Sequence, residues 1–148
     1  MRANPLAIRL RVGGAAGRHR LLLTCVTRVY TVGEARAVLA SLRPALDEVI
    51  AVRADAVELA ASVRQGTPSP LGGLPELKAA DARLDELLSS IASHDLQLKG
   101  IAPLLLDFPA ELDGAPVLLC WLEGDPELSW YHRADLGFLG RRRIPGRP

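Results

Sequence analysis

The sequence predicts an α+β fold in which a long antiparallel helical hairpin is followed by a small antiparallel sheet. Three observations support this prediction. Two segments carry apolar residues at seven-residue intervals, a connector rich in proline and glycine separates them, and the last third of the chain consists of short apolar segments divided by turn residues. An apolar stripe at helical spacing must be buried against a partner, so two stripes joined by one loop predict two helices that pack on each other.

Length and composition are those of one small domain. The chain has 148 residues, of which 49% are hydrophobic and 24% are charged, and its formal net charge is +1. This balance gives no general attraction to nucleic acid or to an anionic membrane surface. No apolar run approaches the roughly 18 residues of a membrane-spanning helix. Two distant cysteines, Cys25 and Cys120, are typical of free thiols in a reducing compartment. We therefore expect a cytoplasmic protein.

The first predicted helix spans residues 32–64 and begins with a capping signal. Thr31 is followed three residues later by Glu34, the pattern of a capping box in which each side chain bonds a backbone amide. The apolar stripe that follows consists of Ala35, Leu42, Val49, Ala56 and Val63. Pro44 interrupts this pattern, and because proline lacks an amide hydrogen we expect a kink or a break near it.

The second predicted helix spans residues 75–98, after a flexible connector over residues 66–73. Pro75 is favoured in a first helical turn, and two heptad series follow it: Leu77, Leu84, Ile91 and Leu98, with Ala80, Leu87 and His94. Residues 1–28 are predicted to form a mobile or weakly ordered arm, residues 29–144 a single α+β domain, and residues 145–148 a tail.

The remaining segments predict about three antiparallel strands that rest on the helices. Their expected ranges are residues 103–107, 116–122 and 127–132. Asp113-Gly114 and Gly124-Asp125 are turn dipeptides, and they lie on either side of the second of these strands.

The strands also carry the residues best suited to chemistry. Asp107, Cys120 and His132 are candidate catalytic residues, because a carboxylate can orient an imidazole as a general base and a thiol can act as a nucleophile. Candidate ligand-binding residues are Trp121, Glu123, Trp130 and Arg141. The same residues have a structural interpretation, in which Cys120 is a small buried apolar residue and Arg141 binds Asp107 or Asp135. Both interpretations remain open at this point.

Metal and cofactor binding are not predicted from local spacing. The three histidines, His19, His94 and His132, are far apart in the sequence, and neither cysteine belongs to a metal-binding pair. No phosphate-binding loop is present either, since the glycines of residues 11–19 are not followed by Gly-Lys-Ser/Thr.

The order of these residues resembles that of an uncharacterised prokaryotic family, the domain of unknown function twenty-two-oh-three. The resemblance covers residues 29–144, and the residues that match the family pattern are Lys99, Asp107-Phe108-Pro109, Gly114, Leu119-Cys120-Trp121, Gly124, His132 and Gly137-Phe138-Leu139-Gly140-Arg141. The family has no established reaction, so the resemblance bears on the fold more than on the function.

Two functions follow as expectations. The first is a non-enzymatic interaction or self-association module, because two long apolar stripes exceed what a small sheet can cover and would bind a second copy or another protein through their helix faces. The alternative is a small-ligand binding protein or an enzyme, with a pocket between the sheet and the hairpin lined by Asp107, Cys120, Glu123 and His132.

Overall fold

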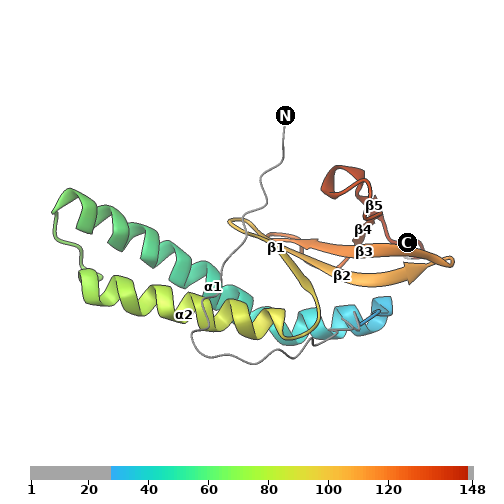
Figure 1. Cartoon of the computed structure of the whole chain (residues 1–148), viewed down its shortest axis with the longest axis horizontal. Coiled ribbons are helices and arrows are strands. Elements are labelled where there is room, and N and C mark those ends of the chain that lie inside the picture. Colours follow the sequence, from blue (N-terminus) through green and yellow to red (C-terminus); the bar gives the residue numbers. More distant parts are fainter. Residues whose placement is uncertain (1–27, 147–148) are drawn as a thin grey trace, which may run out of the picture.

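The computed structural model describes residues 28–146, so the predicted N-terminal arm lies outside the described residues except for Arg28. Two helices, α1 (Val32–Gln65) and α2 (Leu74–Ala92), precede a five-stranded antiparallel sheet. The helices lie side by side, and the sheet lies over the half of α1 that comes first in the chain (Figure 1). The predicted α+β class and the order of helices before sheet are confirmed. Neither helix is long and apolar enough to cross a lipid bilayer, among the residues described.

The sheet is a meander whose strands are neighbours in space in the order of the sequence. Its strands are β1 (Gln97–Ile101), β2 (Leu104–Leu112), β3 (Ala115–Leu122), β4 (Trp130–His132) and β5 (Arg142–Arg143), with a short 3₁₀ helix, η1 (Phe138–Gly140), before the last strand. β2 and β3 form the longest pair. Asp113 and Gly114 join them with φ angles of 52° and 76°, the left-handed conformation that a tight hairpin turn requires.

The prediction of about three strands is wrong, because it misses β1 and β5. The second helix was expected to continue to residue 98, but α2 ends at Ala92 and the chain turns at Asp95, whose φ is 58°. Leu98 therefore belongs to β1, where it pairs with Leu106. Leu96 and Leu98 both pack on the core, so their spacing fits a strand as well as the end of a heptad series.

α1 runs through Pro44 without interruption, so a break near this residue does not occur. Proline in a helix interior costs about 3 kcal/mol. The residues on both sides of Pro44, Leu39, Leu42, Leu46 and Val49, are all buried. Burial of each such side chain contributes about 1.5–3 kcal/mol, so their combined burial exceeds the cost of the proline.

The hydrophobic core lies between α1 and one face of the sheet. Along β2 the residues that belong to this core are Leu104, Leu106, Phe108 and Ala110, and along β3 they are Val117, Leu119 and Trp121. Consecutive residues of a strand point to opposite faces. The intervening residues of β2 and β3, among them Asp107 and Cys120, therefore face away from the helices.

Replacement of Pro44 by alanine should stabilise the protein, because the new amide can donate to the carbonyl of Ala40 and the ring no longer crowds that turn. We expect Pro44→Ala to raise the free energy of unfolding by about 1–3 kcal/mol, measured by urea denaturation. Pro75→Ala is the matched control, because Pro75 lies in the first turn of α2 where no helical hydrogen bond is lost. A destabilised Pro44→Ala variant would contradict this account of α1.

Candidate functional site

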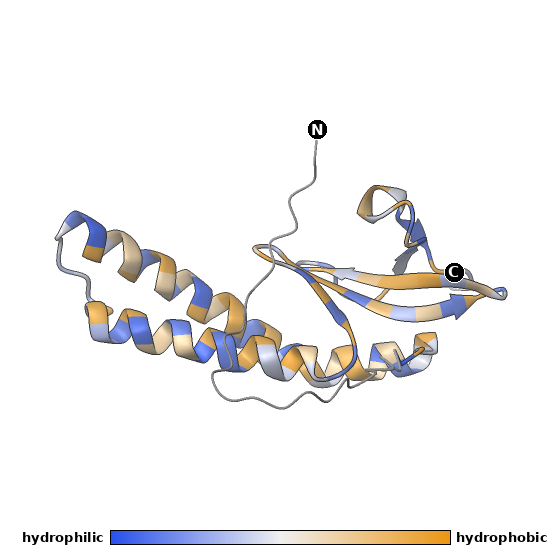
Figure 2. Cartoon of the chain, viewed as in Figure 1, coloured by the Kyte–Doolittle hydropathy of each residue, from blue (hydrophilic) through white to orange (hydrophobic). Residues whose placement is uncertain are grey.

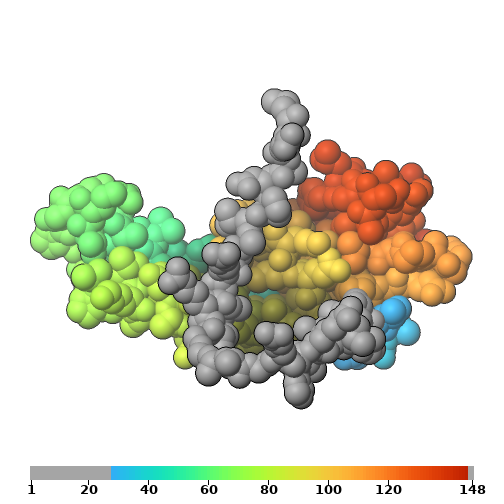
Figure 3. Space-filling model, viewed as in Figure 1, coloured from blue at the N-terminus to red at the C-terminus, as the bar shows by residue number. Residues whose placement is uncertain are grey.

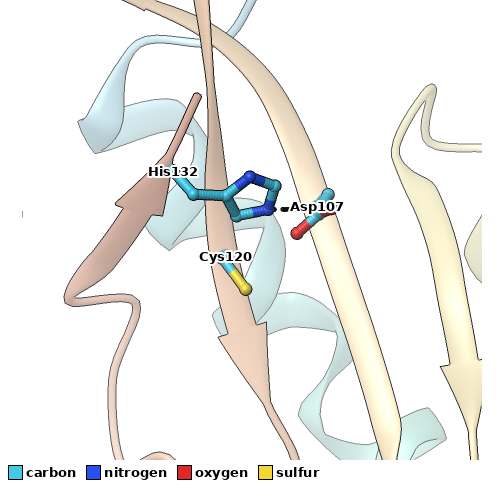
Figure 4. Close-up of side chains that lie close together, drawn as sticks. All are labelled: Asp107, Cys120 and His132. Carbon is cyan, nitrogen blue, oxygen red and sulfur yellow. Dashed lines mark hydrogen bonds and ion pairs between the residues drawn. The ribbon is translucent and has the colours of Figure 1, made fainter. Parts of the chain in front are cut away.

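Three candidate catalytic residues converge on the face of the sheet that points away from the helices. Asp107 on β2 is directly opposite Cys120 on β3, and His132 on β4 is opposite Leu118, two residues before Cys120. The side chains of Asp107, Cys120 and His132 lie close together (Figure 4). We call them the Asp–Cys–His cluster. All three are buried, with exposed fractions of 2%, 0% and 4%.

The cluster is compact enough to coordinate one metal ion. One potential ligand atom from each residue, a carboxylate oxygen, a sulfur and an imidazole nitrogen, lies within 4.8 Å of the other two. Ligand atoms on a tetrahedral zinc ion, with bonds of about 2.0–2.3 Å, lie about 3–4 Å apart. The separations in the cluster are therefore close to those of a zinc site. Local sequence spacing did not predict this site, because its residues come from three different strands.

Hydrogen bonding determines which nitrogen of His132 faces the cluster. Nδ1 lies 2.9 Å from the backbone carbonyl of Arg133, which can only accept, so Nδ1 must carry a proton. Nε2 lies 3.3 Å from Oδ2 of Asp107. In the neutral ring Nε2 has a lone pair and is an acceptor. It then faces Oδ2 of Asp107, which is also an acceptor when the carboxylate is ionised. Either a proton or a metal cation between the two atoms is needed to make this contact favourable.

One further oxygen of the cluster has no hydrogen bond of normal geometry. Oδ1 of Asp107 is buried and accepts no hydrogen bond from the residues described. Burial, and next the negative charge of Asp107, raise the pKa of the Cys120 thiol to about 12. In the absence of a cation the thiol is therefore protonated and is a poor nucleophile. A bound metal ion would reverse this balance, because it favours the thiolate and the carboxylate together.

Glu123 does not belong to the cluster, contrary to the predicted pocket lining. Its carboxylate accepts two bonds from Arg53 of α1, at 2.9 and 2.8 Å, and one from the amide of Leu104 at 2.8 Å. Arg53 also donates to the carbonyl of Ile101. These contacts attach α1 to the turn between β1 and β2 and to the end of β3. The predicted pocket between the sheet and the hairpin is therefore not formed by these four residues, because Glu123 turns toward the helices and the Asp–Cys–His cluster lies on the opposite face.

The remaining candidate ligand-binding residues have structural contacts. Trp121 is buried in the core, and its indole nitrogen donates to the carbonyl of Asp125. Arg141 binds the carboxylate of Asp125, not that of Asp107 or Asp135 as predicted. The Arg141 guanidinium also lies 4.9 Å from the ring of Trp130 and 4.8 Å from that of Phe138. Arg141 thus holds η1 against β4, beside the cluster.

A pocket of about 260 Å³ opens next to the Asp–Cys–His cluster. Asp107 and His132 form part of its wall, and Lys99 and Phe138 lie on other sides. Lys99 and Phe138 were not predicted as site residues, although both belong to the set that carried the family resemblance. Their position depends on β1 and η1, which the sequence pattern did not predict.

The fold and the cluster together define a small α+β protein with a potential mononuclear metal site on its sheet. A family model, described as "Uncharacterized conserved protein (DUF2203)", matches residues 28–144. The chain belongs to this family. Comparison with curated proteins and with solved structures finds no match.

The Arg53–Glu123 pair gives a pH-dependent contribution to stability. The hydrogen bonds that Glu123 accepts from Arg53 lower the pKa of its carboxyl most, and the hydrogen bond from the Leu104 amide is the second cause. A lowered pKa stabilises the fold above the unfolded-state pKa, about 4.3, and this contribution is lost as the pH falls through the folded-state value. We expect Glu123→Gln to cost about 1–2 kcal/mol at pH 7, measured by urea denaturation, with a smaller loss at pH 3–4.

Glu48→Gln is the control for this measurement. Glu48 also pairs with an arginine, Arg83, but both side chains are exposed on the helix surface. It should change stability less than Glu123→Gln. A loss in Glu123→Gln that stays constant across this pH range would show that shape, not charge, determines its contribution.

Proposed function

We propose that this protein binds one divalent transition-metal ion, of which zinc fits the ligands best, through Asp107, Cys120 and His132. The observation that carries the proposal is that three unlike ligand types meet in one buried cluster with unmet bonding capacity. Sulfur, imidazole nitrogen and carboxylate oxygen are all ligands of zinc. Three protein ligands leave a fourth position open, as in zinc sites that bind water or an external ligand.

A metal ion accounts for the cluster better than a buried ion pair does. A proton between His132 and Asp107 satisfies Nε2 and Oδ2, but Oδ1 of Asp107 still has no hydrogen bond of normal geometry. The thiol of Cys120 is the remaining donor beside this carboxylate, and a thiol is only a weak donor. A cation satisfies all three side chains at once. The bond from Nδ1 of His132 to the carbonyl of Arg133 is the outer contact that orients most metal-binding histidines.

Cobalt substitution tests the proposal directly. We expect the protein to bind one equivalent of Co²⁺ and to show a thiolate-to-cobalt charge-transfer band together with intense tetrahedral d–d bands. Cys120→Ala and His132→Asn should remove the charge-transfer band and the tetrahedral spectrum respectively. Cys25→Ser and His94→Asn are the matched controls, since Cys25 is the other cysteine of the sequence and His94 lies in the turn after α2, and both should keep the full spectrum.

A second measurement on the unaltered protein covers the case in which a cluster variant does not fold. Zinc in excess over its dissociation constant should raise the melting temperature by about 5–10 °C, and a chelator should reverse the change. Protein that contains no metal after purification, and whose melting temperature responds to none of zinc, cobalt, nickel or iron, would rule out the metal site.

We also propose self-association through the end of the hairpin that projects beyond the sheet, because that end exposes apolar side chains. Val57 is 66% exposed and Leu74 is 50% exposed, and Val63 and Leu71 are exposed nearby. The projecting ends of both helices stand clear of the sheet (Figure 3) and still carry apolar residues (Figure 2). Beyond Arg53, α1 buries only Ala56 and Leu59. A second copy packed on this end would complete a four-helix bundle.

Light scattering at increasing protein concentration tests this association. We expect a dimer, and we expect Val57→Glu and Leu74→Glu to shift the population toward the monomer because each would place a charge in the bundle interface. Leu139→Glu is the control, since Leu139 is 99% exposed on η1 at the other end of the molecule. A monomer at the highest attainable concentration would contradict the proposal.

A further inference from the structure

The pocket beside the Asp–Cys–His cluster has three kinds of wall. Asp107 and His132 bring two of the proposed metal ligands to its surface, Lys99 contributes an amine, and Leu105, Leu118 and Phe138 are apolar. A ligand in this pocket therefore lies beside two of the proposed metal ligands, a positive charge and an apolar surface at the same time. Residues that line a pocket of this mixed kind fix the orientation of a small ligand through their polar groups.

The charges favour an anion at the open metal position. The complex of a divalent ion with a thiolate, a carboxylate and a neutral imidazole has no net charge. The charge of Lys99 therefore makes the pocket positive overall. The other charged groups close to the pocket compensate each other: Arg133 pairs with Asp135 at 2.6 Å, and Arg141 pairs with Asp125. Within residues 28–146, no ion pair of Lys99 is formed.

The volume and the apolar wall of the pocket restrict the part of the ligand that does not carry the negative charge. At about 260 Å³ the pocket lies just below the range of sites for drug-sized ligands, so it suits a molecule of few atoms. Leu105 and Leu118 are neighbours of the cluster on β2 and β3, and Phe138 is held in place by the Arg141 guanidinium. A short hydrocarbon chain or a single ring would bury apolar surface against these three side chains.

We propose that the pocket binds a small organic monocarboxylate, whose carboxylate is the fourth metal ligand and pairs with Lys99 while its apolar part packs on Leu105, Leu118 and Phe138. This inference rests on the metal site proposed above. Arg141 has the part of a positioning residue, because it fixes η1 and does not reach the ligand itself. The proposal assigns no reaction to the site, only the class of molecule that it recognises.

Titration of the full-length, cobalt-loaded protein with acetate, butyrate and benzoate tests the inference. Each carboxylate should shift the d–d bands, and butyrate should bind about tenfold more tightly than acetate because it buries two more methylene groups. Butyramide has the same shape without the charge and should cause no shift. Lys99→Ala should weaken butyrate binding about tenfold or more, whereas Lys78→Ala, an exposed lysine on α2, should leave it unchanged.

The outcomes separate the two proposals. A protein that binds no cobalt contradicts the metal site. A protein with the thiolate-to-cobalt band, but with d–d bands that no carboxylate changes, retains the metal site and overturns the carboxylate pocket. Equal affinity for acetate and butyrate would overturn the apolar contact, and unchanged affinity in Lys99→Ala would overturn the part assigned to Lys99.

Discussion

The burial of the α1 stripe against one face of the sheet is the constraint on which the rest of the structure depends. Leu42 and Leu46 belong to the same buried apolar cluster as Leu106, Phe108 and Leu119, and a strand that slips by one residue would turn every one of its side chains to the wrong face. The register of β2 and β3 is therefore set by hydrophobic burial. The position of the polar residues between the apolar ones follows from that register.

The Asp–Cys–His cluster is the consequence of this register on the other face. Asp107 and Cys120 are opposite each other because their neighbours in the sequence belong to the core. On this face the segment after β4 contributes Phe138 to the wall of the pocket beside Asp107 and His132. Arg141 attaches this segment through Asp125 and Trp130. A buried carboxylate oxygen without a hydrogen-bond partner, such as Oδ1 of Asp107, is costly. Its presence on an otherwise well-packed sheet favours a bound cation at this position.

The sequence was a good guide where a pattern is local. The capping box of Thr31 and Glu34, the long helix and the Asp113–Gly114 turn are as expected, because each depends on neighbouring residues. Prediction failed where contacts between residues far apart in the sequence determine the structure. The first two residues of β1 were assigned to the second helix, since heptad spacing could not show that Leu98 would pair with Leu106. Glu123 was grouped with the cluster, because only the fold brings it to Arg53. Asp107, Cys120 and His132 were predicted as candidate catalytic residues but not as a possible metal site, since spacing rules describe metal sites within one loop or helix.

The position of the cluster also explains how ligand binding could affect the fold. β4 has three residues and β5 has two, so the sheet edge that supplies His132 is much shorter than the β2–β3 pair that supplies Asp107 and Cys120. Short edge strands contribute little pairing of their own. A metal ion bound by all three residues would join β4 to the stable pair, and its binding energy would then become folding energy for the segment that covers the site. The residues that bind the ion and the residues that enclose it would then be stabilised together. Occupancy of the site would thus be linked to the order of the pocket wall formed by Phe138.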